Sequence, residues 1–243
     1  MWAVFRKEIT SFFASPIAYL IIGIFLILNG LFLWVFEGTF NIFDYGFADL
    51  GNFFLLAPWI LLLLIPAICM RSFSDEMKMG TLELIYISPA SLWQIVLAKN
   101  LAAMLLSVLA VLPTLLYIYS ISELGIEQGN LDVGLALGSY IGLLFLIMAY
   151  SSISVFTSSI TDNQIVAFIS GLLLCFVLFY LSEGLASLVQ DGGNSLLLAN
   201  MGLKARFETM ARGILDSRDM IYFMSITALF IILTIFQLKY RAK

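Results

Sequence analysis

The residue types on which most enzymes depend are scarce in this chain of 243 residues. It contains no histidine, and its two cysteines, Cys69 and Cys175, lie inside apolar runs. It has neither a G-x-x-x-x-G-K-[ST] phosphate loop nor a G-x-G-x-x-G motif. These absences exclude histidine-dependent acid–base catalysis, Ser-His-Asp triads, histidine-based metal sites and ATP binding through a P-loop. We therefore expect no catalytic residue, no cofactor and no metal ion.

The polar residues with the most informative spacing form a charged loop from residue 71 to residue 99. We expect the helix before it to continue to residue 79 and Gly80 to end that helix. Thr81 can then cap a short second helix, in whose first turn Glu83 is favoured by the helix dipole. The pattern predicts a helix, a sharp turn, a short helix, a second turn and a third helix.

An apolar group interrupts this charged loop. Its members are Leu82, Leu84, Ile85 and Ile87. Apolar residues on a loop that should lie in water, bordered by Glu76 and Glu83, indicate a docking surface for another protein. The alternative is that they pack onto the membrane or onto residues 1–14.

Residues 1–14 are expected to form an amphipathic helix that lies along the membrane surface. Five apolar residues fall on one side of a helical projection of about 100° per residue, whereas Lys7 and Glu8 point elsewhere. The five are Trp2, Phe5, Ile9, Phe12 and Phe13. Aromatic residues opposite charged ones are typical of an interfacial helix, although the segment could be the flank of the first span. Ser15-Pro16 is a helix start signal, repeated at Ser88-Pro89, and indicates a break there.

The composition is that of a membrane protein. Hydrophobic residues make up 62% of the chain and charged ones 12%, and the mean hydropathy is +1.03. Soluble domains carry roughly 25% charged residues, so a soluble enzyme is nearly excluded. The net charge of −4 offers no basic face for nucleic acid. Because roughly 20 apolar residues span a bilayer, the uncharged windows predict an all-α, polytopic protein with six transmembrane helices. The expected spans are about 16–36, 52–70, 100–121, 134–160, 164–182 and 220–238.

The basic residues predict the orientation of these spans. Eight of the 12 fall on the side of the N-terminus, and the other four lie together in the long last loop, residues 183–219, on the opposite side. This asymmetry favours cytoplasmic N- and C-termini. We expect residues 1–243 to form a single transmembrane domain.

Two features mark the fourth expected span. Glycines at every fourth position near its outer end let another helix approach closely, either within the chain or from a second copy. Farther along, a row of hydroxyl side chains either lines a polar path or bonds back to backbone carbonyls and neighbouring helices. The glycines are Gly134, Gly138 and Gly142, and the hydroxyl row is Ser151, Ser154, Ser158 and Thr161.

The spans contain no ionisable residue near mid-membrane. Ion-coupled secondary transporters usually hold one there, which counts against self-contained ion coupling. Six spans together with a docking loop favour a transport subunit that is driven by a separate ATPase.

The charged loop resembles the inner-loop signature of the ABC-2 type transporter permeases. The resemblance is carried by Arg71, Glu76, Gly80, Thr81, Glu83, Pro89 and Lys99. It extends over the whole chain, because the amphipathic start, the six spans and the long last outer loop all follow that family's order. Residues 15–19, 88–96 and 212–223 resemble the gliding-motility-associated ABC permeases of Bacteroidota. Related permeases of copper-enzyme maturation share the inner-loop pattern.

The resemblance implies a mechanical role in the bacterial inner membrane. Residues 80–87 would be a coupling helix that enters a groove on a separate ABC ATPase subunit, with residues 1–14 as a connecting helix beside it. The interface would comprise Arg71, Glu76, Gly80, Thr81, Leu82, Glu83, Leu84, Tyr86 and Pro89. ATP would close two nucleotide-binding subunits, and two permease copies would rock between inward- and outward-facing states, favouring export. In the gliding subgroup, an accessory membrane-anchored protein with a periplasmic domain is a further partner.

Two other classes of function are weighed against this one. A non-transporting component that transmits ATP-driven motion to periplasmic proteins would also fit the large outer loop. An ion-coupled carrier or channel fits less well, because no charged residue lies inside the spans.

Overall fold

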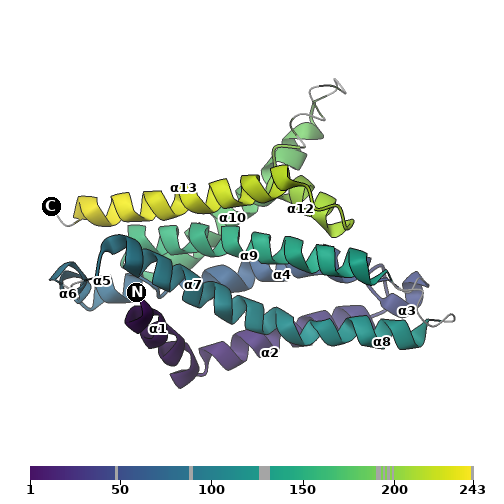
Figure 1. The fold of residues 1–243 in the computed structure, drawn as a ribbon, viewed down its shortest axis with the longest axis horizontal. Coiled ribbons are helices and arrows are strands. Elements are labelled where there is room, and N and C mark those ends of the chain that lie inside the picture. Colours follow the sequence, from purple (N-terminus) through teal and green to yellow (C-terminus); the bar gives the residue numbers. More distant parts are fainter. Residues whose placement is uncertain are drawn as a thin grey trace.

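The computed structural model describes most of the chain (Figure 1). The residues outside the description are 47, 48, 88, 89, 126–131, 190–192, 194, 196, 197, 199, 242 and 243, together with the side chains of residues 45, 84 and 85. Across the described residues the chain is helical and has no strand. This confirms the all-α prediction.

Within the described part of the chain, six helical segments are long and apolar enough to cross a membrane, which confirms the predicted number. They are α2 (Ile17–Gly30) with a π-helical turn (Leu31–Val35), α4 (Gly51–Cys69) with α5 (Ser74–Lys78), α7 (Leu92–Val111) with a 3-10 turn (Leu112–Leu115) and α8 (Leu116–Leu124), α9 (Val133–Ile160), α10 (Gln164–Ala186) and α13 (Ser217–Arg241). Pro113 lies within the 3-10 turn, because proline cannot donate the helical hydrogen bond. The third segment begins eight residues earlier than the expected residue 100.

Among the described residues, four shorter helices flank the spanning ones. They are α1 (Trp2–Ala14), α3 (Ile42–Tyr45), α6 (Leu82–Ile87) and α12 (Leu203–Ala211). In Figure 1, α1, α5, α6 and both chain termini lie at one end, which we call the terminal end. The opposite half of the bundle, which we call the far end, carries α3, the end of α8, and α12, which lies beside the start of α13 and short of the tip of α8. The terminal end is the one that the basic residues assign to the cytoplasm.

Helices α4 and α9 form the centre of the bundle. In the most apolar window of α4, 72% of the residues are buried inside the protein, and in that of α9 56% are. Helix α9 packs against α4, α10, α12 and α13, and the core between them includes Leu146 and Ile153. By contrast, only 22% of the α10 window and 28% of the α2 window are buried. Their exposed apolar side chains are suited to lipid or to another membrane helix.

The helix breaks at the terminal end differ in detail from the sequence signals. The chain breaks after Ala14, as Ser15-Pro16 indicates, but the Ser15 hydroxyl donates back to the carbonyl of Phe12 (3.2 Å) and so closes α1. Helix α7 begins with a capping box in which Ser91 and Gln94 bond to each other's backbone. The expected start signal at Ser88-Pro89 lies outside the described residues.

The expected continuation of the second span to residue 79 is interrupted. Helix α4 ends at Cys69, and residues 70–73 form turns before α5 begins. The hydroxyl of Ser158 on α9 accepts hydrogen bonds from the backbone N–H groups of Phe73 (3.0 Å) and Ser74 (3.2 Å). A side chain from another span therefore caps α5, and this cap cannot be found from the local sequence.

Candidate functional site

A buried lysine organises the charged residues at the terminal end. Lys99 is 2% exposed, and its ammonium donates to Glu8 Oε1 (2.8 Å), Glu76 Oε1 (3.0 Å) and the carbonyl of Ser72 (2.6 Å). It also lies 4.9 Å from the centre of the Phe73 ring, within the range of a cation–π contact. One side chain on α7 thus contacts two carboxylates, a carbonyl and an aromatic face.

This lysine cluster, defined as Lys99, Glu8, Glu76 and the more exposed Lys7, joins three helices. Lys7 lies 3.4 Å from Glu76, and together the two lysines balance the two glutamates. Glu8 and Lys7 belong to α1, Glu76 to α5 and Lys99 to α7. Because each charge is shared between helices, a displacement of α5 is resisted by both α1 and α7.

Lys99 was not predicted as a site residue, because residue 99 was placed at the edge of a loop. In the structure α7 begins at Leu92, so Lys99 lies two turns inside the helix. A lysine at that depth requires a partner, and Glu8 lies 91 residues away in the sequence. The sequence signal that could have placed residue 99 inside a helix was the length of the apolar pattern that begins after Ser91.

The turn between α5 and α6 has the geometry expected of a helix stop. Gly80 has φ +67, a conformation that favours glycine. The backbone N–H of Gly80 bonds to the carbonyl of Met77 (3.1 Å), and that of Thr81 bonds to Glu76 (2.9 Å), forming a Schellman motif. The Thr81 hydroxyl, which we expected to cap α6, donates to the carbonyl of Glu76 (3.2 Å) and so closes α5.

Helix α6 lies at the outer edge of the terminal end, beyond α7 and α9 and level with the end of α13 (Figure 1). Glu83 is exposed on it, Ile87 is 80% exposed, and Leu82 is partly buried against the core. The hydroxyl of Tyr86 donates to the carbonyl of Leu238 near the end of α13 (2.8 Å). Burial raises the pKa of Tyr86 and outweighs the opposing charge of Arg241, so the hydroxyl stays protonated at neutral pH.

The remaining predicted loop residues are distributed around α6. Arg71 lies at the break between α4 and α5, and Glu76 belongs to the lysine cluster. Leu84 is part of α6, but its side chain is outside the description, as is all of Pro89.

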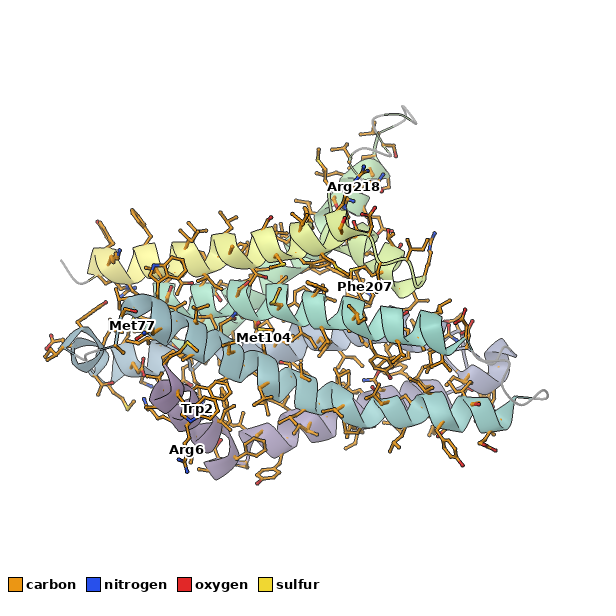
Figure 2. The ribbon with its side chains drawn as sticks, in the orientation of Figure 1. Trp2, Arg6, Met77, Met104, Phe207 and Arg218 are labelled. Atoms are coloured by element: carbon orange, nitrogen blue, oxygen red, sulfur yellow. The ribbon has the colours of Figure 1, made fainter. Side chains whose placement is uncertain are left out.

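The predicted apolar face of α1 is divided between the protein and its surroundings. Phe12 and Phe13 pack partly buried against the core, and Phe5 and Ile9 are half-buried. Trp2 is 72% exposed and stacks on Phe5 with ring centres 5.3 Å apart. In Figure 2, Trp2 and Arg6 mark this helix. Every described position of α1 retains some exposure, since none of its residues is buried.

Comparison with known families decides the class of the chain. Residues 3–234 match the ABC-2 family transporter proteins. The chain is an ABC-2 family transporter protein. No curated protein matches it. As a member of this family it is a multi-pass membrane permease subunit of an ABC transporter, and such subunits lack the ATPase site.

In this ABC-2 permease the hydroxyl row of α9 is bonded within the protein. Ser151 donates to the carbonyl of Ile147 (2.8 Å) and Ser154 to that of Tyr150 (2.7 Å). Ser158 bonds across to the carbonyl of Met70 (3.1 Å). All three serines are at most 2% exposed. Thr161 lies at the end of α9, where its hydroxyl accepts from the N–H of Asn163 (3.2 Å). Back-bonding and bonding between helices therefore account for these hydroxyls.

The glycines of the permease's α9 receive a segment of the same chain. A methyl group built on Gly142 would lie 2.9 Å from Met210 Cβ, and one on Gly138 would lie 3.1 Å from Gly213 Cα. Met210 belongs to α12, as does Phe207, which is labelled in Figure 2, and Gly213 lies just after this helix. Gly134 meets only Asp132 on its own helix. Gly138 and Gly142 therefore let α12 approach α9 closely.

Ion pairs fix α12 at the far end of the permease. Arg206 donates to Asp219 (2.8 Å), which is 2% exposed, and Lys204 donates to Glu183 (2.5 Å). Burial lowers the pKa of Lys204, but the hydrogen bond and the charge of Glu183, with Glu208, outweigh burial and raise it. Arg212 and Asp216 stand four residues apart in the sequence, but α12 ends at Ala211 and Gly213 turns the chain with φ +77, so no continuous helix joins these two residues.

Proposed function

We propose that this permease is driven by a separate ABC ATPase subunit that grips α6, and that it works as an exporter-type transporter. The observation that carries the proposal is the position of α6, a short helix that projects from the terminal end with an exposed acidic residue, Glu83. A projecting helix with mixed apolar and acidic character suits a groove on a partner protein. The proposed contact residues are Arg71, Glu76, Gly80, Thr81, Leu82, Glu83, Leu84, Tyr86 and Pro89.

Two links support a path from α6 into the membrane. The first is the hydrogen bond from Tyr86 to Leu238, which joins α6 to the end of α13. The second is the Schellman turn, which joins α6 directly to α5 and so to Glu76 of the lysine cluster. A partner that moved α6 would act on α13 through the first link and on α1 and α7 through the second. ATP can shift the permease between two conformations only if the contacts of α6 differ between them, and these two links would supply that difference.

Charge reversal on α6 tests the proposal. In a reconstituted complex with its ATPase, Glu83→Arg is expected to leave the permease inserted and folded but to uncouple ATP hydrolysis from transport. Glu123→Arg is the matched control, because Glu123 is also exposed but lies near the end of α8, at the far end. Equal coupling in the two variants would contradict the role of α6.

We also propose that two permease copies associate in the membrane. The sparse burial of α10 (22%) and α2 (28%) supports this, because both helices leave apolar side chains exposed. A second copy would cover part of that surface, and lipid the rest. The mass of the complex in nanodiscs tests the stoichiometry, since a single permease per complex would contradict it.

The association with gliding motility rests on the resemblance of residues 15–19, 88–96 and 212–223 to the gliding subgroup. We propose that the permease acts in the inner membrane, with cytoplasmic termini and an accessory membrane-anchored protein bearing a periplasmic domain. Deletion of the gene from a gliding host should abolish spreading on agar, and complementation should restore it. Normal spreading of the deletion strain would contradict this assignment.

The second candidate function is transmission of ATP-driven motion to periplasmic proteins without transport. The observation that favours it is the firm attachment of α12 to the far end, through Arg206–Asp219 and the glycines of α9. Such an attachment would carry motion of α9 and α13 to a surface outside the membrane. ATP-dependent movement of a substrate into vesicles would contradict this alternative.

A further inference from the structure

A cavity of about 220 Å³ lies at the terminal end between α1 and the α4–α5 segment, beside the contact of α1 with α7. Residues of α1, α4, α5 and α7 line it, as does Ile17 at the start of α2. Its walls are of two kinds. Apolar side chains such as Phe12, Ile17 and Ile68 form one part, and the ionisable side chains of Lys7, Arg71 and Asp75 form another. A wall with both characters fits an amphiphile better than a water-soluble metabolite.

The cavity lies at the depth expected of phospholipid headgroups. Residues 50–70 contain no charged residue, and Arg71 is the first charge after them. A stretch of that length spans the hydrocarbon core, so its charged end marks the interface. Helix α1, on which Arg6 and Lys7 are exposed, packs against α7 at the depth of this interface.

Three ionic groups at the cavity have unused hydrogen-bonding capacity. Arg71 is exposed and makes no ion pair or hydrogen bond with any described residue. Asp75 accepts the side-chain amide of Gln164 on Oδ1, which leaves Oδ2 without a donor in the described part of the chain. Glu76, in the same wall, has a buried Oε2 that also lacks a partner there. The cavity therefore offers the unpaired guanidinium of Arg71 and, beside it, carboxylate oxygens that lack a hydrogen-bond donor in the described part of the chain.

We propose that this cavity binds the headgroup of an aminophospholipid, with the phosphate on Arg71 and Lys7 and the primary ammonium toward Asp75. A guanidinium suits a phosphate because it presents paired donors. An ammonium supplies the N–H donors that the acidic wall lacks. The acyl chains leave along the apolar wall beside Phe12 and Ile17. Basic pockets between spanning helices are recurrent headgroup sites.

The charge pattern distinguishes this lipid from its common alternatives. A phosphatidylglycerol headgroup would satisfy Arg71 but would carry no ammonium to Asp75 and Glu76. A phosphatidylcholine headgroup carries a quaternary ammonium, which has no N–H to donate. A zwitterionic headgroup with a primary amine complements both sides and leaves the net charge of the site unchanged.

Native mass spectrometry of the purified complex, in mixed micelles with equal amounts of phosphatidylethanolamine, phosphatidylglycerol and phosphatidylcholine, tests the proposal. We expect phosphatidylethanolamine to be retained preferentially. Arg71→Gln should lower its retention about tenfold, the effect of losing a charge-assisted hydrogen bond. Asp75→Asn should remove the preference over phosphatidylglycerol. Arg6→Gln is the matched control, because Arg6 is exposed on α1 but does not line this cavity.

Three outcomes would overturn the proposal. They are equal retention of the three lipids, preferential retention of phosphatidylglycerol, and the same effect from Arg71→Gln as from Arg6→Gln. If Arg71→Gln instead released the ATPase subunit with lipid retention unchanged, the cavity would belong to the protein interface. Because the experiment measures lipid retention, its result does not depend on transport or on the docking of α6.

Discussion

The two ends of the molecule hold their charged residues in different ways. At the terminal end, Lys99 is shared between Glu8 and Glu76, whereas α6 is joined to the last turns of α13 by the hydrogen bond from Tyr86. At the far end, α12 lies directly on the glycines of α9 and is held by Arg206 to Asp219. One end combines a tight cluster with a projecting helix, and the other holds a short helix seated directly against a spanning helix.

This difference indicates where motion can enter the fold. Helix α6 can be displaced without opening the core, because none of its described side chains is fully buried. Helix α12 buries Leu203, Phe207 and Met210, so it moves only with the bundle. The terminal end therefore suits the input of motion, and the far end suits its output.

The largest expected effect of a single substitution is at Lys99. Lys99→Met leaves Glu8 and Glu76, whose side chains are 12% and 11% exposed, without their shared cation. Breaking a buried ion pair in this way costs about 3–5 kcal/mol of unfolding free energy. Denaturant unfolding in mixed micelles measures it. Lys7→Met is the control, since Lys7 is 67% exposed and should cost at most about 1 kcal/mol. Equal losses in the two variants would refute a cluster centred on Lys99.

The far end should respond less to loss of its buried charge. Asp219→Asn keeps the size of the side chain but removes the charge that Arg206 binds at 2.8 Å. Because Arg206 is 35% exposed and can be solvated, we expect a loss of about 1–3 kcal/mol. Limited proteolysis within residues 200–216 should accelerate in this variant. Unchanged proteolysis would mean that the ion pair does not hold α12.

The close contact between α9 and α12 predicts a loss of stability for Gly142→Ala. The added methyl group would lie 2.9 Å from Met210 Cβ, so the two helices must separate, at a cost of about 1–3 kcal/mol. Gly23→Ala on α2 is the control, because nothing lies within 4 Å of that position. Alanine there should be neutral or favourable for the helix. If both variants unfold alike, α12 does not press on α9.

The smallest effect on stability is expected for Tyr86→Phe. This variant loses one hydrogen bond, to Leu238, worth about 0.5–1.5 kcal/mol. Its coupling of ATP hydrolysis to transport should nevertheless fall, because α6 would lose its link to α13. The ratio of substrate moved to ATP hydrolysed in proteoliposomes measures this effect. A ratio equal to that of the unmodified protein would show that the tyrosine is dispensable for coupling.

The number of spans and the helix stop at Gly80 could be predicted because both depend on local sequence. Uncharged windows mark spans, and glycine is the residue that adopts φ +67 easily. The capping box of Ser91 and Gln94 is also a local sequence pattern, but Ser88-Pro89 offered a competing helix start signal a few residues earlier.

The rest of the candidate site could not be found locally. Glu8 meets Lys99 across 91 residues, and Ser158 caps a helix on another span. Such pairs exist only after the helices pack. The ion pair between Arg206 and Asp219 likewise spans the turn at Gly213, so helical spacing does not reveal it.

Cross-linking from α6 in native membranes tests the central claim most directly. Cys69 and Cys175 are buried, so a cysteine introduced by Glu83→Cys would be the readily accessible thiol and could carry a photoactivatable cross-linker. The account predicts that Glu83→Cys captures an ATP-binding subunit, identified by mass spectrometry, and that Glu123→Cys at the far end does not. Cross-links from position 83 to lipid alone, or the same products from both positions, would contradict it.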